Sequence, residues 1–392
     1  MKVLSHTLWV VCLFVAVSAG ATQPQYRKKK NRNLSLRISA RPNDKLTTYA
    51  SIGLIEATER LHGVSINLGG TVSSDKSAGV QIGGIFNVSE HFSGLSVAGI
   101  TNVYEKASGI AISGLVNAGQ EFKNGAQLTS LVNVAQQQKR ALSISLLMNV
   151  SQTSTHSIQL SALTNVSGVN RGGLMLTGLG NISTENSGVQ IAGFSNIAIE
   201  NSGVNMALLN ISATNNGLQL GGLNITSEEG RGLQVGLVNI SRKDDIRQLG
   251  LVNLKPSTQK EYQFTASNTD ALNAGIRFKN KYTYTQLGLS SYHFGLSSPF
   301  TLSGVFRAGL YRALGTRWEV YGDLGYKHIE TFRNKNEGKP RRLYAFQPRV
   351  GITYMPFARF GFTLSGGYEW ARTYGNGYQK GKTTVELGIV LR

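Results

Sequence analysis

Asparagine is the residue whose spacing carries the most chemical information in this chain. Twelve asparagines recur at steps of 14 to 16 residues. They are Asn87, Asn102, Asn117, Asn133, Asn149, Asn165, Asn181, Asn196, Asn210, Asn224, Asn239 and Asn253. A carboxamide both donates and accepts hydrogen bonds, so asparagines stacked one above another can bond to each other and to nearby backbone. We therefore predict a structural ladder of buried amides, which we call the Asn ladder.

The acidic residues of the repeats lack the grouping that a catalytic site needs. Single acids follow the ladder asparagines by a few residues, at Glu90, Glu105, Glu121, Glu185, Glu200, Glu228 and Asp244. Glycan-cleaving enzymes and calcium sites need several acids on one face, and His91 and His156 stand isolated in the sequence. We expect exposed turn residues here, with no catalytic residue, cofactor or metal site. An enzyme built on a β-helix that acts on glycans is the alternative.

Several ladder asparagines also form glycosylation sequons, for example Asn87-Val88-Ser89 and Asn181-Ile182-Ser183. In each repeat a small polar residue follows the apolar one, which creates the sequon without any role in modification. An asparagine buried in a ladder is inaccessible to glycosylation. We therefore interpret the sequons as a by-product of the repeat.

A second set of charged residues lies in the last third of the chain, where polar and apolar residues alternate. Eight of them fall on the polar face of the expected strands: Arg277, Arg307, Glu319, Asp323, Lys327, Arg349, Glu369 and Glu386. In a small β-barrel the lumen is filled by side chains. We expect these charges of mixed sign to pair inside such a lumen rather than to line a conducting pore.

The elements that carry the asparagines are predicted to be short strands. In one unit, Val80 and Ile82 alternate with polar residues, and the apolar phase shifts after Gly83-Gly84 to Ile85 and Val88. This pattern favours two short strands joined by a bend, repeated about every 15 residues. Units of this kind bury a core only by stacking, so residues 49–256 are predicted to form a β-solenoid. Thr71 and Glu56 hold the ladder position in degenerate units, as expected at a capping end.

The pattern changes after Lys255-Pro256, and residues 257–392 are predicted to form eight antiparallel strands. The strands are long, with one apolar face, one polar face and aromatic residues near their ends, which is typical of an outer-membrane β-barrel. A soluble β-sandwich is the alternative, although its strands are usually shorter. Connections near Ala313 and Pro356 are short, whereas those after Thr331 and Thr373 are long. Long loops face the outside in such barrels, which places the solenoid in the periplasm.

The N-terminus indicates export. Residues 1–21 combine a positive start, an apolar run and small residues, as in a secretory signal peptide, and residues 22–48 form an expected basic linker. Cys12, the only cysteine, lies inside the apolar run, so the mature chain is expected to contain none. The net charge of +19 is compatible with nucleic-acid binding, but export argues against that partner.

Units such as Gly217-Leu218-Gln219-Leu220-Gly221 and Gly232-Leu233-Gln234-Val235-Gly236, each followed by a ladder asparagine, resemble a known repeat. The resemblance is to the "surface repeat" outer-membrane proteins of Bacteroidota and spirochaetes, which carry tandem GLQxGLxNI-like units. It implies an outer-membrane or surface setting and supplies no catalytic residues. Between Ala126 and Asn165 this chain departs from the regular pattern, with Ser or Leu in place of Gly.

The sequence thus favours a non-enzymatic outer-membrane protein whose barrel anchors a repeat rod with a structural or binding role. Its expected partners are outer-membrane lipid and a protein or glycan held along the solenoid, without nucleic acid. A small transport or assembly component is a further alternative, which would require an open lumen.

Overall fold

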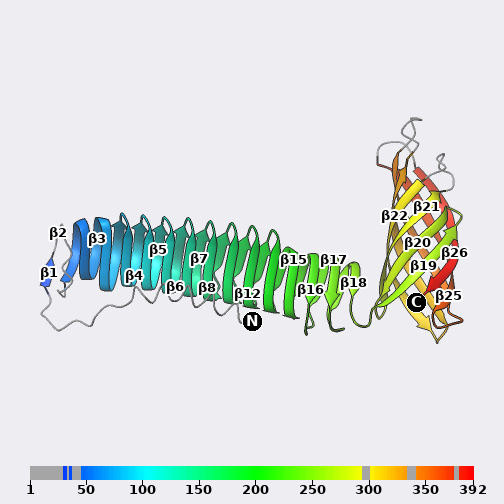
Figure 1. The fold of residues 1–392 in the computed structure, drawn as a ribbon, viewed down its shortest axis with the longest axis horizontal. Coiled ribbons are helices and arrows are strands. Elements are labelled where there is room, and N and C mark those ends of the chain that lie inside the picture. The colour runs from blue at the N-terminus through cyan, green and yellow to red at the C-terminus, as the bar shows by residue number, and fades with distance from the viewer. Residues whose placement is uncertain (1–29, 33–34, 38–45, 294–300, 333–340, 375–378) are drawn as a thin grey trace. The chain divides into compact units, whose positions relative to one another are not determined.

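The computed structural model describes residues 30–32, 35–37, 46–293, 301–332, 341–374 and 379–392. All regular structure in these residues is β-strand (Figure 1). A β-solenoid of about twelve turns is followed by a closed eight-stranded antiparallel β-barrel, which confirms the predicted fold class. The chain divides into two compact units, residues 1–212 and 213–392. In the part of the chain that the structure describes, no helix is long and apolar enough to cross a membrane.

The solenoid is one sheet of 18 strands whose coils stack in parallel. Its strands are β1 (Lys30–Arg32), β2 (Ser35–Arg37), β3 (Leu46–Gly83), β4 (Phe86–Ala98), β5 (Thr101–Ser113), β6 (Val116–Thr129), β7 (Val132–Ser145), β8 (Met148–Thr155), β9 (Ile158–Ser161), β10 (Thr164–Arg171), β11 (Leu174–Thr177), β12 (Gly180–Asn186), β13 (Val189–Ala192), β14 (Ser195–Asn201), β15 (Val204–Asn215), β16 (Leu218–Thr226), β17 (Leu233–Ser241) and β18 (Arg247–Leu254). Each ladder asparagine pairs in register with the asparagine of the next coil, as Asn102 does with Asn117. The spacing of 14 to 16 residues is therefore the length of one coil.

Each coil has three short sides rather than the two strands that the sequence predicted. In the coil of β5, the first side is 101–104, the second 106–108 and the third 110–113. The alternation of buried and exposed residues changes phase between these sides, and Glu105 drops out of the pairing. The chain bends again at Gly109, whose φ of 106° suits glycine. We use the terms first, second and third side for the equivalent residues of every coil.

Coil length varies at two bends. From the start of the third side to the next ladder asparagine, the step is seven residues from Val189 to Asn196 but six from Leu218 to Asn224. At the bend between the second and third sides, a glycine with positive φ turns the chain in the coils of β4 and β5, at Gly94 and Gly109. The coils of 16 residues add one residue there in the left-handed region: Asn124 (φ 51°), Arg140 (φ 50°), His156 (φ 48°) and Gly172 (φ 59°). Pairing continues in register through this region, which includes the irregular repeats between Ala126 and Asn165.

The interior of the solenoid is polar, whereas much of its outer surface is apolar. Gln81 is 1% exposed, whereas its neighbour Ile82 is 38% exposed. The same sense of alternation holds along the rod, where buried side chains are mostly Asn, Gln, Ser, Thr and Ala. The narrow coil thus fills its interior with small residues and with amides that bond from coil to coil, and the apolar alternation seen in the sequence marks the outside.

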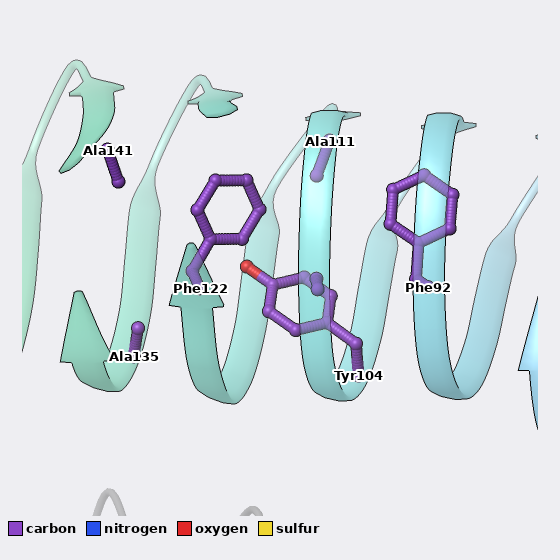
Figure 2. Close-up of a cluster of buried hydrophobic side chains, with 7 residues drawn as sticks. Phe92, Tyr104, Ala111, Phe122, Ala135 and Ala141 are labelled. Carbon is purple, nitrogen blue, oxygen red and sulfur yellow. The ribbon is translucent and has the colours of Figure 1, made fainter. Parts of the chain in front are cut away.

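One aromatic cluster interrupts this polar interior (Figure 2). Phe92, Tyr104 and Phe122 lie one above another with alanines around them, and the rings of Tyr104 and Phe122 are 5.6 Å apart. The Tyr104 ring covers Gly119, where a Cβ atom would lie 2.0 Å from it. Glycine at position 119 is therefore needed to accommodate the tyrosine of the preceding coil.

The barrel closes through pairing of its first and last strands, as Phe264 with Ile389. Its strands are β19 (Gln259–Ser267), β20 (Asp270–Lys279), β21 (Thr283–His293), β22 (Thr301–Leu314), β23 (Trp318–Thr331), β24 (Arg342–Tyr354), β25 (Phe360–Thr373) and β26 (Gln379–Leu391). Neighbouring strands are antiparallel throughout. These are the eight strands expected for residues 257–392.

The N-terminal segments differ in part from expectation. Within the stretch expected to be a basic linker, β1 and β2 pair in parallel with β3, as Lys30 with Leu46 and Ser35 with Ser51. Part of residues 22–48 is therefore sheet rather than linker, because these residues add to the solenoid edge. The predicted signal peptide, residues 1–21, lies outside the described residues.

Candidate functional site: the Asn ladder and the barrel lumen

The ladder asparagines are buried and bond directly from one coil to the next. In each of ten successive pairs, the Nδ2 of the earlier asparagine donates to the Oδ1 of the later one. The distances are 3.2 Å for Asn87–Asn102, 2.9 Å for Asn102–Asn117, 3.0 Å for Asn117–Asn133, 2.9 Å for Asn133–Asn149, 2.9 Å for Asn149–Asn165, 3.2 Å for Asn165–Asn181, 2.9 Å for Asn181–Asn196, 3.1 Å for Asn196–Asn210, 2.8 Å for Asn224–Asn239 and 2.8 Å for Asn239–Asn253. The structure therefore brings the predicted residues together in one row.

The second hydrogen of each ladder amide goes to the backbone. Asn102 donates to the carbonyl of Ile112 at 2.7 Å, and Asn133 donates to that of Ile144 at 2.8 Å. These carbonyls belong to the third side, one residue before it ends. The ladder thus ties the first side of one coil to the third side, close to the bend that joins them. Its role in the structure is to satisfy polar groups in the interior.

Further buried amides form rows that the sequence analysis did not identify. Gln234 donates to Gln219 at 2.9 Å, and Gln248 donates to Gln234 at 2.9 Å. On the second side, Asn170 donates to Asn186 at 2.9 Å. The signal in the sequence was a polar residue held between two apolar ones, as in Leu233-Gln234-Val235. Such a residue points to the opposite face from its neighbours and, in this solenoid, points inward.

The interior also holds the buried hydroxyl group of Tyr104. Gln127 Nε2 donates to the Tyr104 hydroxyl, which is buried inside the aromatic cluster. Burial raises the pKa of Tyr104 well above its usual value. The phenol therefore stays protonated, and its position is structural.

The single acids of the repeats lie at the outer surface, as expected. Glu90, Glu185, Glu200, Glu228 and Asp244 are exposed. Glu105 and Glu121 are half-buried, and Glu121 lies 2.5 Å from Lys123. Among the residues that the structure describes, no group of three or more His, Cys, Asp or Glu side chains is arranged to hold a metal ion.

The structure places all eight predicted lumen charges inside the barrel. Their exposed fractions are 0% for Arg277, 2% for Arg307, 4% for Glu319, 8% for Asp323, 0% for Lys327, 4% for Arg349, 7% for Glu369 and 5% for Glu386. Each belongs to an ion pair with another lumen residue. The pairs form three groups along the lumen.

The middle group is centred on Asp323. Its carboxylate lies 3.0 Å from Arg307 Nη1 and 3.0 Å from Arg349 Nε, and the Tyr284 hydroxyl donates to it. Arg349 continues the network to Glu386 at 2.6 Å. This carboxylate on β23 thus joins charges from β22, β24 and β26 across the lumen.

A second group lies toward the short turns of the barrel. Lys279 Nζ is 3.0 Å from Glu261 and 2.5 Å from Glu319, so one ammonium group bridges two carboxylates. Arg277 lies close to the same two carboxylates, and its guanidinium stacks on the Tyr284 ring at 4.2 Å. Such clustering offsets part of the cost of removing charges from water.

A third group lies toward the opposite end. Lys327 pairs with Asp270 and, at 2.7 Å, with Glu369. His293 Nε2 lies 2.8 Å from the other oxygen of Asp270. The carboxylate of Asp270 is thus held between two nitrogen groups from β21 and β23.

Several lumen residues were missed in the sequence, among them Glu261, Asp270, Lys279, His293 and Tyr284. The available signal was the alternation of Glu261, Gln263 and Thr265 with outward aromatic residues in β19. The side chains leave little free space. A cavity of about 10 Å³ lies beside Gln263, Arg307 and Glu386, which is room for about one water molecule.

The outer face of the barrel is apolar in the middle and aromatic toward both ends. Leu324 is 57% exposed and Val350 is 70% exposed near the middle of their strands. At the end with short turns, Trp318 and Tyr354 stack with ring centroids 4.4 Å apart. At the other end, Tyr368 and Trp370 are 4.8 Å apart. This is the distribution of a surface that meets hydrocarbon between two interfaces.

Comparisons with known proteins find low similarity to two solved structures. No protein-family model matches the chain, and no curated protein matches it. A solved structure from the de novo design of transmembrane β-barrels is 12% identical over 35% of this chain and 97% of its own, with a TM-score of 0.24. The outer membrane protein Ail of Yersinia pestis is 16% identical over 35% of this chain and 99% of its own, with a TM-score of 0.23. Function is therefore inferred from the residues of this chain.

Proposed function

We propose that this chain is a non-enzymatic outer-membrane protein whose barrel spans the membrane and anchors the solenoid, which has a structural or binding role. The main support for this proposal is the distribution of residues in the barrel, which has ion pairs inside and an apolar band outside. Buried charges such as Lys327 and Arg349 lie opposite exposed side chains such as Leu324 and Val350. This distribution places apolar groups against hydrocarbon and charges away from it.

The dimensions of the apolar band agree with this proposal. Trp318 and Tyr326 lie eight residues apart on β23, which spans about 27 Å along the strand at ~3.4 Å per residue. With a strand tilt of about 40°, the distance along the barrel axis is about 21 Å, close to the ~25 Å apolar band of membrane barrels.

The filled lumen argues against a channel. Arg307, Asp323 and Arg349 meet across the interior, so a solute would have to break buried ion pairs to pass. We therefore favour an anchor over the transport alternative. The outer-membrane setting also agrees with the resemblance of the repeats to the "surface repeat" proteins, whose membership we propose on the repeated units alone.

An arginine scan of the outer face tests the membrane proposal. Leu324→Arg places a charge in the middle of the band and should cost about 2–4 kcal/mol of unfolding free energy, against about 0–1 kcal/mol near the interface. Phe357→Arg, in the turn after β24, is the matched control at a 69% exposed position. Unfolding in lipid vesicles can be followed by the fluorescence of Trp318 and Trp370. Equal, small effects at both positions would instead indicate that the outer face of the barrel does not lie in hydrocarbon.

The periplasmic placement of the solenoid is part of the same proposal, based on the alternation of short and long connections. Protease added to intact cells should leave residues 50–254 uncut and should cut them after the outer membrane is permeabilised. Cleavage within this range on intact cells would place the solenoid on the cell surface instead.

A further inference from the structure

The outer surface of the solenoid has two apolar sides and one charged side. On the first side, the residue after each ladder asparagine is apolar, as at Val88, Val150 and Ile197. The third side directs pairs such as Ile110 and Ile112 outward, at 44% and 37% exposed. Both sides are therefore mainly apolar over successive coils, with small polar residues such as Thr101, Thr164 and Ser195 among the apolar ones on the first side.

The bend between the third and first sides carries one large apolar residue per coil, which we call the apolar corner. It includes Ile85 at 49% exposed, Ile100 at 45%, Leu115 at 42%, Leu163 at 41%, Leu179 at 54% and Phe194 at 54%. Because each coil rises by only about 4.8 Å, these side chains form one continuous row. Monomeric soluble proteins rarely expose an apolar surface that continues in this way.

The charged residues of the same coils are segregated on the second side and its bends. Lys106, Lys123, Lys139 and Arg171 are exposed there, with Glu185 and Glu200 in later coils. The cross-section of the rod is therefore amphipathic. This is the arrangement of elements that lie in a membrane interface, with one face in hydrocarbon and the other in water.

The backbone at the apolar corner meets the strictest requirement of a lipid environment, which is that its polar groups bond within the protein. The amide of Ile100 donates to the carbonyl of Ile85 at 2.8 Å, and Leu115 donates to Ile100 at 2.9 Å. Farther along the rod, Phe194 donates to Leu179 at 3.1 Å. The amides of Ile100, Leu115 and Phe194 would therefore stay satisfied in hydrocarbon.

We propose that the first and third sides and the apolar corner lie in the hydrocarbon of one membrane leaflet, with the second side facing headgroups and water. A side of four residues measures about 13 Å at ~3.3 Å per residue, and half of the hydrocarbon core is about 15 Å thick. The coil thus matches the depth of one leaflet. The inference rests on the proposed function in that the barrel supplies the membrane to which the solenoid is tethered.

Lipid fits this surface better than a protein partner does. A protein interface combines an apolar core with a polar rim and close shape complementarity. Here the apolar surface extends over two sides and the corner, and its exposed residues differ in shape and size, from Ile85 to Phe194. Fluid acyl chains adapt to such variation. A second copy of the chain is the competing occupant that the test must distinguish.

The test uses the full chain with Cys12→Ser, because Cys12 is the only cysteine. Single cysteines are introduced at Leu115 and Leu179 on the apolar corner and at Lys106 and Glu185 on the second side, and each is labelled with an environment-sensitive fluorophore. Leu324→Cys on the barrel reports whether the barrel itself is inserted. The labelled proteins are reconstituted into phosphatidylethanolamine and phosphatidylglycerol vesicles with or without brominated acyl chains, and iodide serves as the aqueous quencher.

We expect brominated chains to quench Leu115→Cys and Leu179→Cys to an extent similar to Leu324→Cys, whereas iodide quenches the labels at Lys106 and Glu185. Iodide quenching at the apolar corner, with Leu324→Cys quenched by lipid, would overturn this inference and leave the barrel proposal intact. Protection of the corner from both quenchers would overturn it in favour of a second copy. Failure of lipid quenching at Leu324→Cys would contradict the barrel proposal itself. The circular dichroism spectrum of each labelled variant, compared with that of the unlabelled chain, checks that its coils are folded, and only folded variants are compared.

Discussion

Asn149 donates to Oδ1 of Asn165 at 2.9 Å while its own Oδ1 accepts from Asn133 at 2.9 Å. Its second hydrogen goes to the carbonyl of Leu160 at 2.7 Å. One buried side chain thus links three successive coils and one bend. Because repeat proteins are stabilised by nearest-neighbour contacts, the effect of losing this side chain should be local.

Asn149→Ala should destabilise the coils around β8. The substitution leaves the amide of Asn133 and the oxygen of Asn165 without this partner, and each unsatisfied buried group costs about 1–3 kcal/mol. Hydrogen exchange should accelerate in β7, β8 and β10 while distant coils keep their protection. Gln152→Ala, at an exposed position in the same strand, is the control and should change little. Equal exchange in both variants would show that the ladder contributes no stability.

Gly119→Ala should destabilise the aromatic cluster by overpacking. The new methyl group would lie 2.0 Å from the Tyr104 ring. Forcing such a ring to move typically costs about 1–3 kcal/mol. Gln120→Ala, at the exposed neighbouring position, is the control. Urea unfolding followed by circular dichroism measures both, and a stability for Gly119→Ala equal to that of the control would contradict the packing argument.

Tyr104 should make the solenoid less stable at alkaline pH. Its pKa is raised in the folded chain, whereas in the unfolded chain the phenol ionises near its usual pKa of about 10. Stability is therefore complete below about pH 10 and falls as the pH rises toward the folded pKa, because only the unfolded chain loses the proton. Tyr104→Phe should remove this contribution to the alkaline loss of stability. At neutral pH it should lower the free energy of unfolding by about 1 kcal/mol, because the hydrogen bond from Gln127 is lost.

The matched control for this pH dependence is Tyr49→Phe, since Tyr49 is 43% exposed. Urea unfolding on both sides of pH 10 should show a smaller alkaline loss for Tyr104→Phe than for Tyr49→Phe. Identical pH profiles would mean that Tyr104 ionises freely in the folded chain.

Asp323→Asn should strongly destabilise the barrel. The substitution removes the charge that faces Arg307 and Arg349, and breaking a buried ion pair costs about 3–5 kcal/mol because an uncompensated charge remains. Glu330→Gln on the same strand is the control, since its partner Arg342 is 57% exposed, and should cost about 0–1 kcal/mol. The two variants can be compared by denaturant unfolding in vesicles. Similar losses would indicate that water enters the lumen.

The sequence predicted the periodic parts of this protein well. Regular recurrence identified the Asn ladder, and long alternation identified all eight barrel strands. In the barrel, this alternation also predicted correctly that Arg307 faces the lumen and Leu324 faces outward, because aromatic residues near the strand ends indicated which face meets lipid. Alternation in the repeats defined two faces just as clearly. It did not say which face was inside, so buried residues such as Gln81 were missed.

Other features depend on contacts between distant residues, which no local pattern reveals. Glu261 lies near the start of the first barrel strand, and its place in the lumen follows from closure, in which Tyr262 pairs with Leu391. The sequence did not reveal the second side of each coil, because the bend before it has a charged residue, Glu105, instead of a residue typical of turns. Sequence reasoning reads such a residue as part of a solvated loop.

The direction of the Asn ladder gives the rod an electrical polarity. Each of the ten hydrogen bonds described above runs from an earlier amide to a later one, so the side-chain dipoles add along the ladder as peptide dipoles add along a helix. The negative end of this row is Asn87 Oδ1, which accepts no hydrogen bond from the described residues, because Thr71 replaces asparagine in the coil before it. Each amide polarises the next in a low-dielectric interior. The solenoid is thus a one-way chain of dipoles, with an acceptor at one end and a donor at the other.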